Sequence, residues 1–464
     1  MSLWTAQEVL LATEGRGPSG WQATGVSIDS RTLEPGDLFV ALRGPRHDGH
    51  AFLADAFARG AAAAIVATDA AIPELGPCIG VADTQRALVD LGQFARARSR
   101  ARIVAVTGSV GKTGTKEALR HVLAREGRTH ASAASHNNHW GVPLSLARLP
   151  ADCRFAVFEL GMNRPGEIRA LVAQVRPQVA IVTWIAPAHI GFFPDETAIA
   201  RAKAEIFACT PPPQVAVLPA DNPHFPLLRR IAEEVGVPRI LVFGTTAEAD
   251  ASLLAADIGP AGSSVEARIL GVPIRYGLSV PGRHWVMNSL AVLAACAALG
   301  VDPERAAAAL GDFALPRGRG TRRSIRLAGG GVATVVDDSY NANPASMRAA
   351  IATLALYPGR RIAVLGEMAE LGERTGELHA ALATELVAAG VARVFVCGEA
   401  MRHLWQALPV ELRGAWTASA EDLLEPVRAE LAAGDVILVK GSNASGMGRI
   451  VDALGEQAVA REDV

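Results

Sequence analysis

The sequence has almost no net charge and no long apolar run. Its 45 Lys and Arg residues nearly balance its 47 Asp and Glu residues, and the formal net charge is −2. This balance excludes the broadly basic surface of a nonspecific nucleic-acid binder. No apolar run reaches the roughly 18 residues of a membrane-spanning helix, and the first residues lack the basic and apolar segments of a secretory signal. We expect a cytoplasmic protein that binds no nucleic acid and does not span a membrane.

Cysteine is also scarce. The five cysteines are widely spaced, their number is odd, and no two form a C-x-x-C pair. This argues against a disulfide framework and suits a reducing compartment. We predict that each is a small core residue, since free cysteine is among the most buried residue types. They are Cys78, Cys153, Cys209, Cys296 and Cys397.

Apolar residues and glycine are abundant. Half of the 464 residues are hydrophobic and 20% are charged, which excludes a disordered chain and leaves enough apolar surface for sizeable cores. Aromatic residues make up only 5%, and there are 45 glycines. This composition predicts a helix-rich α/β protein with many strand-to-helix turns. At roughly 150 residues per domain, the length predicts about three domains.

Short continuous apolar runs recur along the chain, separated by helical segments. They are typical of parallel strands covered on both faces. Such runs lie at 103–106, 155–158 and 179–182, and again at 334–336, 362–365, 394–396 and 436–439. We predict three α/β domains: a small N-terminal domain (1–98), a central parallel-sheet phosphate-loop domain (99–314) and a C-terminal Rossmann-like domain (315–464). Such sheets bind ligands at the carboxyl ends of their strands.

The sharpest motif is T-G-S-V-G-K-T at residues 107–113, between a predicted strand and a predicted helix. In a phosphate loop, backbone N–H groups and the helix N-terminus cradle the phosphates. Lys112 would contact the β- and γ-phosphates, and Thr113 would offer its hydroxyl to Mg²⁺. Val106 stands where the full motif has glycine, and a chance Gly-rich turn is the alternative.

Two residues follow the neighbouring strands of the same predicted sheet. Glu159 ends the apolar run at 155–158, where a carboxylate is costly unless it is paired or binds a cation. It is a candidate Mg²⁺ ligand across from Thr113; the alternative is a solvated acid at a strand end. His189 follows the run at 179–182 and is a candidate site residue by its place at the carboxyl edge. The alternative is a loop histidine that only makes hydrogen bonds.

Lys203 shares the apolar face of a helix predicted to begin near Asp195. The members of this stripe are Ile199, Lys203, Ile206 and Phe207. A lysine whose ammonium is kept dry has a lowered pKa, so its neutral amine would be available to a ligand, a Schiff base or carbon dioxide. The alternative is a lysine that reaches outward to water. Arg201 and Glu205 face elsewhere, and we expect them to pair at the surface.

Polar residues also follow two predicted strands of the C-terminal block. The run D-D-S-Y-N-A-N-P at 337–344 suits ribose or metal–phosphate contacts, and an Asx-rich turn is the alternative. Lys440 follows the apolar run at 436–439 and suits a phosphate or a carboxylate. In the central block, Asn137 and Asn138 belong either to a plain turn or to a loop that contacts a ligand, and the sequence does not decide between the two.

Taken together, these motifs resemble the Mur ligase family of ATP-dependent amide-forming enzymes over nearly the whole chain. D-S-R-T-L-E-P-G-D-L-F-V-A-L at 29–42 and D-G-H at 48–50 resemble its uridine-diphosphate-binding domain. The run at 337–344, G-E-M-A-E-L-G at 366–372 and L-V-K-G-S at 438–442 resemble the branch that adds D-alanyl-D-alanine.

The resemblance implies roles for individual residues. ATP would be contacted by Gly108, Ser109, Gly111, Lys112, Thr113, Asn288, Arg319, Asp338 and Asn341. The other substrates would be contacted by Ser30, Arg31, Asp48, Gly49, His50, Asn137, Asn138, Asn343, Lys440 and Ser442. The catalytic residues would be Lys112, Glu159, His189 and Lys203. Two Mg²⁺ ions would be held by Thr113 and Glu159 and by His189 and Lys203, with Lys203 carbamylated. Two departures from the family pattern flank His189: Trp184 stands where Asn is usual, and Gly191 where an acid is common.

The implied reaction forms an amide through an acyl phosphate. The terminal carboxylate of UDP-N-acetylmuramoyl-tripeptide would attack the γ-phosphate of ATP, and the amine of D-Ala-D-Ala would then expel phosphate. The product would be UDP-N-acetylmuramoyl-pentapeptide, a peptidoglycan precursor. We expect a monomer whose domains close around ATP. The alternatives are a sister ligase that adds another amino acid or glutamate, a phosphate-loop kinase, and a nucleotide-dependent binding protein.

Overall fold

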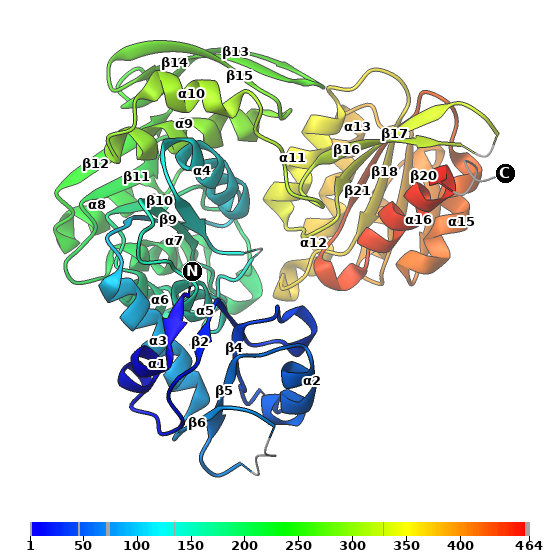
Figure 1. The fold of residues 1–464 in the computed structure, drawn as a ribbon. Coiled ribbons are helices and arrows are strands. Elements are labelled where there is room, and N and C mark those ends of the chain that lie inside the picture. The colour runs from blue at the N-terminus through cyan, green and yellow to red at the C-terminus, as the bar shows by residue number, and fades with distance from the viewer. Residues whose placement is uncertain (1, 45–46, 71–74, 134, 328, 460–464) are drawn as a thin grey trace.

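The computed structural model describes residues 2–44, 47–70, 75–133, 135–327 and 329–459. Within them, the strands form a two-stranded ribbon and sheets of four, nine and six strands. Figure 1 shows three lobes: the blue N-terminal lobe below, the cyan-to-green central lobe above it, and the yellow-to-red C-terminal lobe at the side. The predicted three-domain α/β class is confirmed, and the exact boundaries at 98/99 and 314/315 stay predictions.

The N-terminal lobe is built on the parallel sheet β3-β4-β5-β6. Its elements are β1 (Trp4–Thr5), α1 (Ala6–Thr13), β2 (Gln22–Ala23), β3 (Gly25–Ser27), η1 (Ser30–Thr32), β4 (Asp37–Val40), η2 (Gly49–Phe52), α2 (Leu53–Ala58), β5 (Ala63–Ala67), β6 (Cys78–Val81) and α3 (Thr84–Arg98). Its core includes Leu144 and Ala147 of the next domain. The indole N–H of Trp4 donates to the Ala147 carbonyl at 2.9 Å, so the two lobes share apolar and polar contacts.

The central lobe contains the nine-stranded sheet β15-β14-β13-β12-β11-β10-β7-β9-β8, which is parallel from β8 to β13 and antiparallel beyond. Its strands are β7 (Arg102–Thr107), β8 (Thr129–Ala131), β9 (Phe155–Glu159), β10 (Val179–Val182), β11 (Val215–Pro219), β12 (Arg239–Gly244), β13 (Ala251–Gly259), β14 (Gly262–Ile269) and β15 (Val272–Leu278). Its helical segments are α4 (Lys112–Glu126), α5 (Gly141–Ala147), α6 (Glu167–Val175), η3 (Ile190–Phe192), α7 (Glu196–Ala204), η4 (Glu205–Phe207), α8 (Phe225–Val235), α9 (Arg283–Ala298) and α10 (Pro303–Leu310).

Successive side chains of β7 point to opposite faces of the sheet, so they belong to two different hydrophobic cores. Ile103 and Ala105 pack with α6, α7 and α8, whereas Val104 and Val106 pack with α4 and α9 on the other face. Because both faces are covered, the strand is apolar from Ile103 to Val106, as the sequence predicted.

The C-terminal lobe is a second doubly wound unit with strand order β16-β17-β21-β18-β19-β20. Only β16 is antiparallel to its neighbour within the described part of this sheet. Its strands are β16 (Thr321–Arg326), β17 (Val332–Asp338), β18 (Arg361–Gly366), β19 (Arg393–Cys397), β20 (Arg413–Thr417) and β21 (Val436–Lys440). Its helical segments are α11 (Pro344–Leu354), η5 (Gly372–Arg374), α12 (Thr375–Ala380), α13 (Leu382–Ala388), α14 (Met401–Ala407), η6 (Val410–Leu412), α15 (Ala420–Glu430), η7 (Asn443–Ser445) and α16 (Gly448–Val459).

One surface pair was predicted wrongly. The helix after Asp195 is α7, which ends at Ala204 and continues as a 3₁₀ turn, so Glu205 is not on the expected face. Its carboxylate accepts from the backbone N–H groups of Gly166 (2.7 Å) and Arg169 (3.1 Å) instead of pairing with Arg201. These N–H groups lie at the start of α6 and have no partner within that helix, which makes them good donors to an acid.

Four of the five cysteines are buried, as predicted, and Cys78 is half-buried. All five are free thiols. No helix among the described residues is long and apolar enough to cross a membrane.

Candidate functional site

The phosphate loop leaves β7 at Thr107 and enters α4 at Lys112. Gly108 and Gly111 have φ values of 148° and 84°, a region that favours glycine. A Cβ atom on Gly108 would lie 2.0 Å from the hydroxyl of Thr183, so only glycine fits there. The Lys112 ammonium donates to the Gly108 carbonyl at 2.8 Å. The sequence therefore folds locally as its spacing predicted.

The loop is also fixed by the segment after β10. The Ser109 hydroxyl donates to the Ala186 carbonyl at 2.8 Å, and the Ser109 N–H donates to the Trp184 carbonyl at 2.7 Å. Trp184 thus contributes through its backbone, and its side-chain identity is not what holds the loop.

Glu159 lies directly against the phosphate loop. The Thr113 hydroxyl donates to Glu159 Oε2 at 2.9 Å, and the Asn137 amide donates to Oε1 at 2.8 Å. Glu159 is 1% exposed and Thr113 is 7% exposed. The structure thus brings three of the candidate residues into one buried network, in which both carboxylate oxygens are oriented.

Lys203 is completely buried, and its ammonium has no hydrogen-bond partner among the described residues. Burial lowers the pKa of this lysine well below its ordinary value, and the nearby Lys112 charge lowers it further. Glu159 opposes both effects from the same neighbourhood. The side chain is therefore buried on the apolar face of its helix with a lowered pKa, as the stripe argument predicted, and the charges of Lys112 and Glu159 reach it from the phosphate-loop region.

His189 meets the C-terminal lobe. It has a φ of 61°, and its Nδ1 contacts Glu370 Oε2, 181 residues along the chain. Gly191 donates its N–H to the Glu370 carbonyl at 3.0 Å. The histidine predicted as a metal ligand therefore has one ring nitrogen engaged by a carboxylate.

The C-terminal lobe presents a charged cluster at the carboxyl ends of β17 and β21. Lys440, 2% exposed, donates to Asp338 Oδ2 at 2.6 Å and to the Asn341 carbonyl at 2.9 Å. Burial raises the pKa of Asp338, while the charges of Lys440 and Arg319 act to lower it. The two residues assigned separately to ATP and substrate are thus one buried pair.

Arg319 connects this cluster to the phosphate loop. Its guanidinium lies over the Tyr340 ring at 4.1 Å and donates to the Ser135 hydroxyl of the central lobe at 3.3 Å. Burial lowers the pKa of Lys112, and the charge of Arg319 contributes in the same direction. Arg319 therefore lies between the two lobes, close to both lysine sites.

The remaining predicted ATP and substrate residues of these lobes lie at the phosphate loop, in a turn, at a helix start and after a strand. Asn288 lies against the phosphate loop, 3.0 Å from the position of a Cβ on Gly111. Asn138 accepts from the Gly141 N–H at 2.9 Å, and Asn343 caps α11. Ser442 is 4% exposed and follows β21.

The N-terminal candidates form a separate group. His50 accepts from the Ala67 N–H at 2.9 Å through Nε2, so its Nδ1–H donates to Asp48 at 2.5 Å. A Cβ on Gly49 would lie 2.7 Å from the Leu42 nitrogen, which leaves no room for a side chain. Ser30 is 5% exposed, whereas the side chain of Arg31 is 83% exposed and pairs with Asp29.

Sequence reasoning missed a second buried lysine. Lys116 is 0% exposed, donates to the Ser132 carbonyl at 2.7 Å and pairs with Glu117 at 2.7 Å. It shares the face of α4 with Leu119 and Leu123 at i, i+3 and i+7, so the rule that found Lys203 would have found it too.

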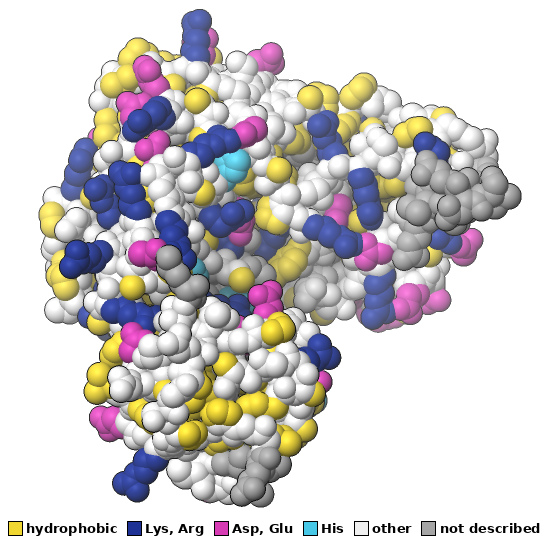
Figure 2. Space-filling model, in the orientation of Figure 1, with side chains coloured by type: hydrophobic (Ala, Val, Ile, Leu, Met, Phe, Trp, Pro, Cys, Tyr) yellow, Lys and Arg dark blue, Asp and Glu magenta, His cyan; other side chains and the backbone are white. Residues whose placement is uncertain are grey.

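No group of three or more His, Cys, Asp or Glu side chains is arranged to hold a metal ion within the described residues. Mg²⁺ commonly takes one or two carboxylates and completes its shell with water and substrate phosphates, so Thr113 and Glu159 fit such a site. Figure 2 shows a hollow where the lobes meet, with basic and acidic side chains along its margins.

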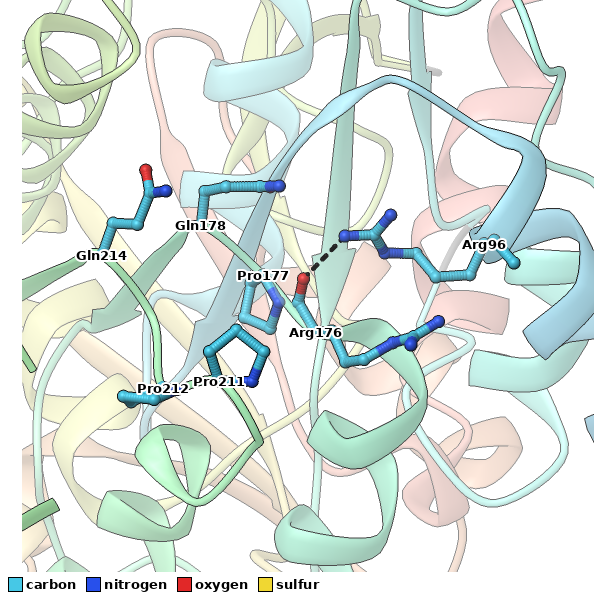
Figure 3. Close-up of a pocket in the computed structure, with 8 residues that line it drawn as sticks. Arg96, Arg176, Pro177, Gln178, Pro211, Pro212 and Gln214 are labelled. Atoms are coloured by element: carbon cyan, nitrogen blue, oxygen red, sulfur yellow. Dashed lines mark hydrogen bonds between the residues drawn. The ribbon is translucent and has the colours of Figure 1, made fainter.

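A cavity of about 410 Å³ lies away from this region, between α3 and the central sheet. Figure 3 shows Arg96 donating to the Arg176 carbonyl there, at 2.9 Å, with Gln178 and Gln214 opposite. The two glutamines precede β10 and β11, so the cavity lies at the amino ends of these strands, and the phosphate loop leaves the carboxyl end of the parallel strand β7. Strand direction therefore separates it from the candidate site.

The fold and the site define a phosphate-loop protein in which a second doubly wound domain brings Arg319 close to the phosphate loop. Family models match three parts of the chain: "Mur ligase family, catalytic domain" at 22–98, "Mur ligase middle domain" at 106–296, and "Mur ligase, glutamate ligase domain" at 322–443. The chain belongs to the Mur ligase family.

Relatives of known name match over nearly the full length. A UDP-N-acetylmuramoyl-tripeptide–D-alanyl-D-alanine ligase of Escherichia coli is 36% identical over 93% of each chain. The crystal structure of MurF from Acinetobacter baumannii has a TM-score of 0.84 at 31% identity and covers 98% of this chain and 99% of its own. MurF ligase from Thermotoga maritima, solved in complex with ADP, has a TM-score of 0.77 at 26% identity, covering 94% and 98%.

Proposed function

We propose that this chain is an ATP-dependent ligase that joins D-alanyl-D-alanine to UDP-N-acetylmuramoyl-tripeptide. The observation that carries the proposal is the buried Thr113–Glu159 pair beside Lys203, whose ammonium has no hydrogen-bond partner among the residues that the structure describes. Arg319 connects this group to the Asp338–Lys440 pair of the C-terminal lobe. The full-length relatives that bear this activity in their names support the choice of substrates.

The proposed reaction begins with the meeting of two anions, the peptide carboxylate and the γ-phosphate of ATP. The carboxylate oxygen attacks phosphorus and ADP leaves, giving an acyl phosphate; the dipeptide amine then attacks the carbonyl carbon and phosphate leaves. Lys112 and the N–H groups at the start of α4 stabilise the phosphate charge. Arg319 reaches the same region from the C-terminal side, so both lobes stabilise the developing charge.

The chain's residues fit a divalent cation and a modified lysine. Thr113 and Glu159 would hold Mg²⁺, which supplies positive charge at the phosphates when bound. A second Mg²⁺ would lie at His189 and Lys203. The neutral amine of Lys203 is suited to add carbon dioxide, which converts a dry amine into a carbamate able to bind a cation. The absence of a hydrogen-bond partner for this amine within the described part of the chain supports the assignment.

ADP release measured with UDP-N-acetylmuramoyl-tripeptide, with and without D-Ala-D-Ala, tests the function. We expect ADP release to depend on both the acceptor and the dipeptide. D-Glu and single amino acids serve as matched amine controls, because a sister ligase would use one of them instead. ADP release that ignores the dipeptide would overturn the proposal.

A further inference from the structure

Glu370 of the C-terminal lobe contacts His189, a candidate site residue of the central lobe. It belongs to the segment between β18 and η5, and its carboxylate meets the ring of His189 in the loop after β10. The side chains of His189 and Glu370 are 25% and 36% exposed, so the contact is partly shielded from water. Among the described residues, Glu370 supplies the carboxylate that contacts this ring. The pair therefore joins two lobes at a candidate catalytic residue.

Backbone contacts fix the same junction. The Gly191 N–H donates to the Glu370 carbonyl at 3.0 Å, and a Cβ on Gly191 would lie 2.8 Å from the Gly372 nitrogen. His189 and Glu370 both have left-handed φ values, 61° and 63°. Non-glycine residues in this region cost free energy and persist where the surroundings over-determine them, commonly at functional sites. Two such residues facing each other make this a specific junction rather than a loose surface contact.

The chemistry of the pair decides which ring nitrogen is free. An ionised carboxylate only accepts hydrogen bonds, so His189 must carry its proton on Nδ1 to pair with Glu370. In the neutral ring, Nε2 then has a free lone pair. Histidines that bind metals are commonly oriented this way, with the second ring nitrogen donating to a carboxylate.

We propose that Glu370 is a positioning residue that holds His189 in the Nδ1–H form, so that Nε2 is available to a divalent cation only while the C-terminal lobe is docked. This deepens the proposed function, because it makes cation binding at His189 depend on the position of a different domain. The proposal also explains why glycine stands at position 191. A side chain there would hold the loop after β10 away from the segment that carries Glu370.

The tautomer tests this directly, without substrate or metal. Full-length enzyme labelled with ¹⁵N-histidine is examined by NMR at pH of about 8.5, two units above an ordinary imidazole pKa, with His189 assigned from a His189→Gln variant. The test variants are Glu370→Gln, whose amide can both donate and accept, and Gly191→Ala, which displaces the junction without changing either side chain. Glu373→Gln is the matched control, since Glu373 is an exposed acid on the same segment.

We expect wild-type enzyme and Glu373→Gln to show one tautomer with a non-protonated Nε2, and both test variants to show mixed tautomers. Mn²⁺ titration by electron paramagnetic resonance, with a non-hydrolysable ATP analogue, should show binding at one site weakened roughly 10- to 100-fold in both. The proposal would be overturned if both test variants kept the tautomer and the Mn²⁺ affinity of the wild-type enzyme. These readouts need no turnover, so a failure of the D-Ala-D-Ala assay would count against the proposed function alone.

Discussion

Lys203→Met should stabilise the central lobe and abolish activity. The lysine head is fully buried without a partner among the described residues, and its pKa is lowered mainly by burial. Methionine fills similar volume and has no charge to desolvate. The native side chain therefore lowers the free energy of unfolding, and the variant removes that cost together with the reactive amine.

The size of the effect depends on pH in a defined direction. Because the folded-state pKa of Lys203 lies below 10.5, the unfolded chain binds more protons between the two values, and wild-type stability rises with pH in that window. The slope is about 1.4 kcal/mol per pH unit, or roughly 3–6 °C in Tm for a domain of this size. Lys203→Met has no titrating group at this position. The difference in the free energy of unfolding between the variant and wild type should therefore shrink by about 1.4 kcal/mol per pH unit as the pH rises toward 10.5.

Scanning calorimetry in degassed buffers across this pH window measures the difference in Tm between the variant and wild type. Lys116→Met is the matched control: Lys116 is equally buried but bonded to Ser132 and Glu117, so its loss should destabilise by about 1–3 kcal/mol. Added bicarbonate should raise the Tm of wild type only, if Lys203 is carbamylated. Parallel Tm–pH curves for wild type and Lys203→Met would refute the reasoning.

Three further outcomes follow from other contacts. Glu159→Gln keeps the shape of the buried network but loses its charge, so ADP release should fall about 10²- to 10³-fold with unchanged circular dichroism; normal turnover would remove Glu159 from the mechanism. Arg319→Lys loses the planar stacking on Tyr340 and should weaken ATP about fivefold by calorimetric titration, whereas equal affinity would show that the stacking is incidental. Gly49→Ala places a methyl group 2.7 Å from the Leu42 nitrogen, so it should destabilise the N-terminal lobe by about 1–3 kcal/mol; an unchanged melting profile would contradict this.

Features encoded by neighbouring residues could be predicted from the sequence. The phosphate loop and the buried strands depend on spacing within a few residues, and they lie where the sequence indicated. The lysine stripe succeeded for the same reason, because helical periodicity decides which side chains share a face.

Pairings set by sheet order could not be predicted. Asp338 and Lys440 are 102 residues apart but are direct partners in register across β17 and β21. Nothing in either strand's own pattern says that the two are neighbours, so each was assigned to a ligand instead of to the other. The contact between His189 and Glu370 could not be predicted either, because it depends on how two domains dock.

The connection between α10 and β16 has a consequence for how the enzyme would work. Arg319 stands between Gly318 and Gly320, whose φ values of 76° and 91° suit a sharp turn of the chain. The stretch of chain that turns between the lobes therefore carries Arg319, which contacts Ser135 of the central lobe and Tyr340 of the C-terminal lobe. Under the proposed function, a change in the angle between these lobes would move Arg319 relative to the phosphate loop. The residence time of the nucleotide would then change with that angle, so a single-molecule record of one would also report the other.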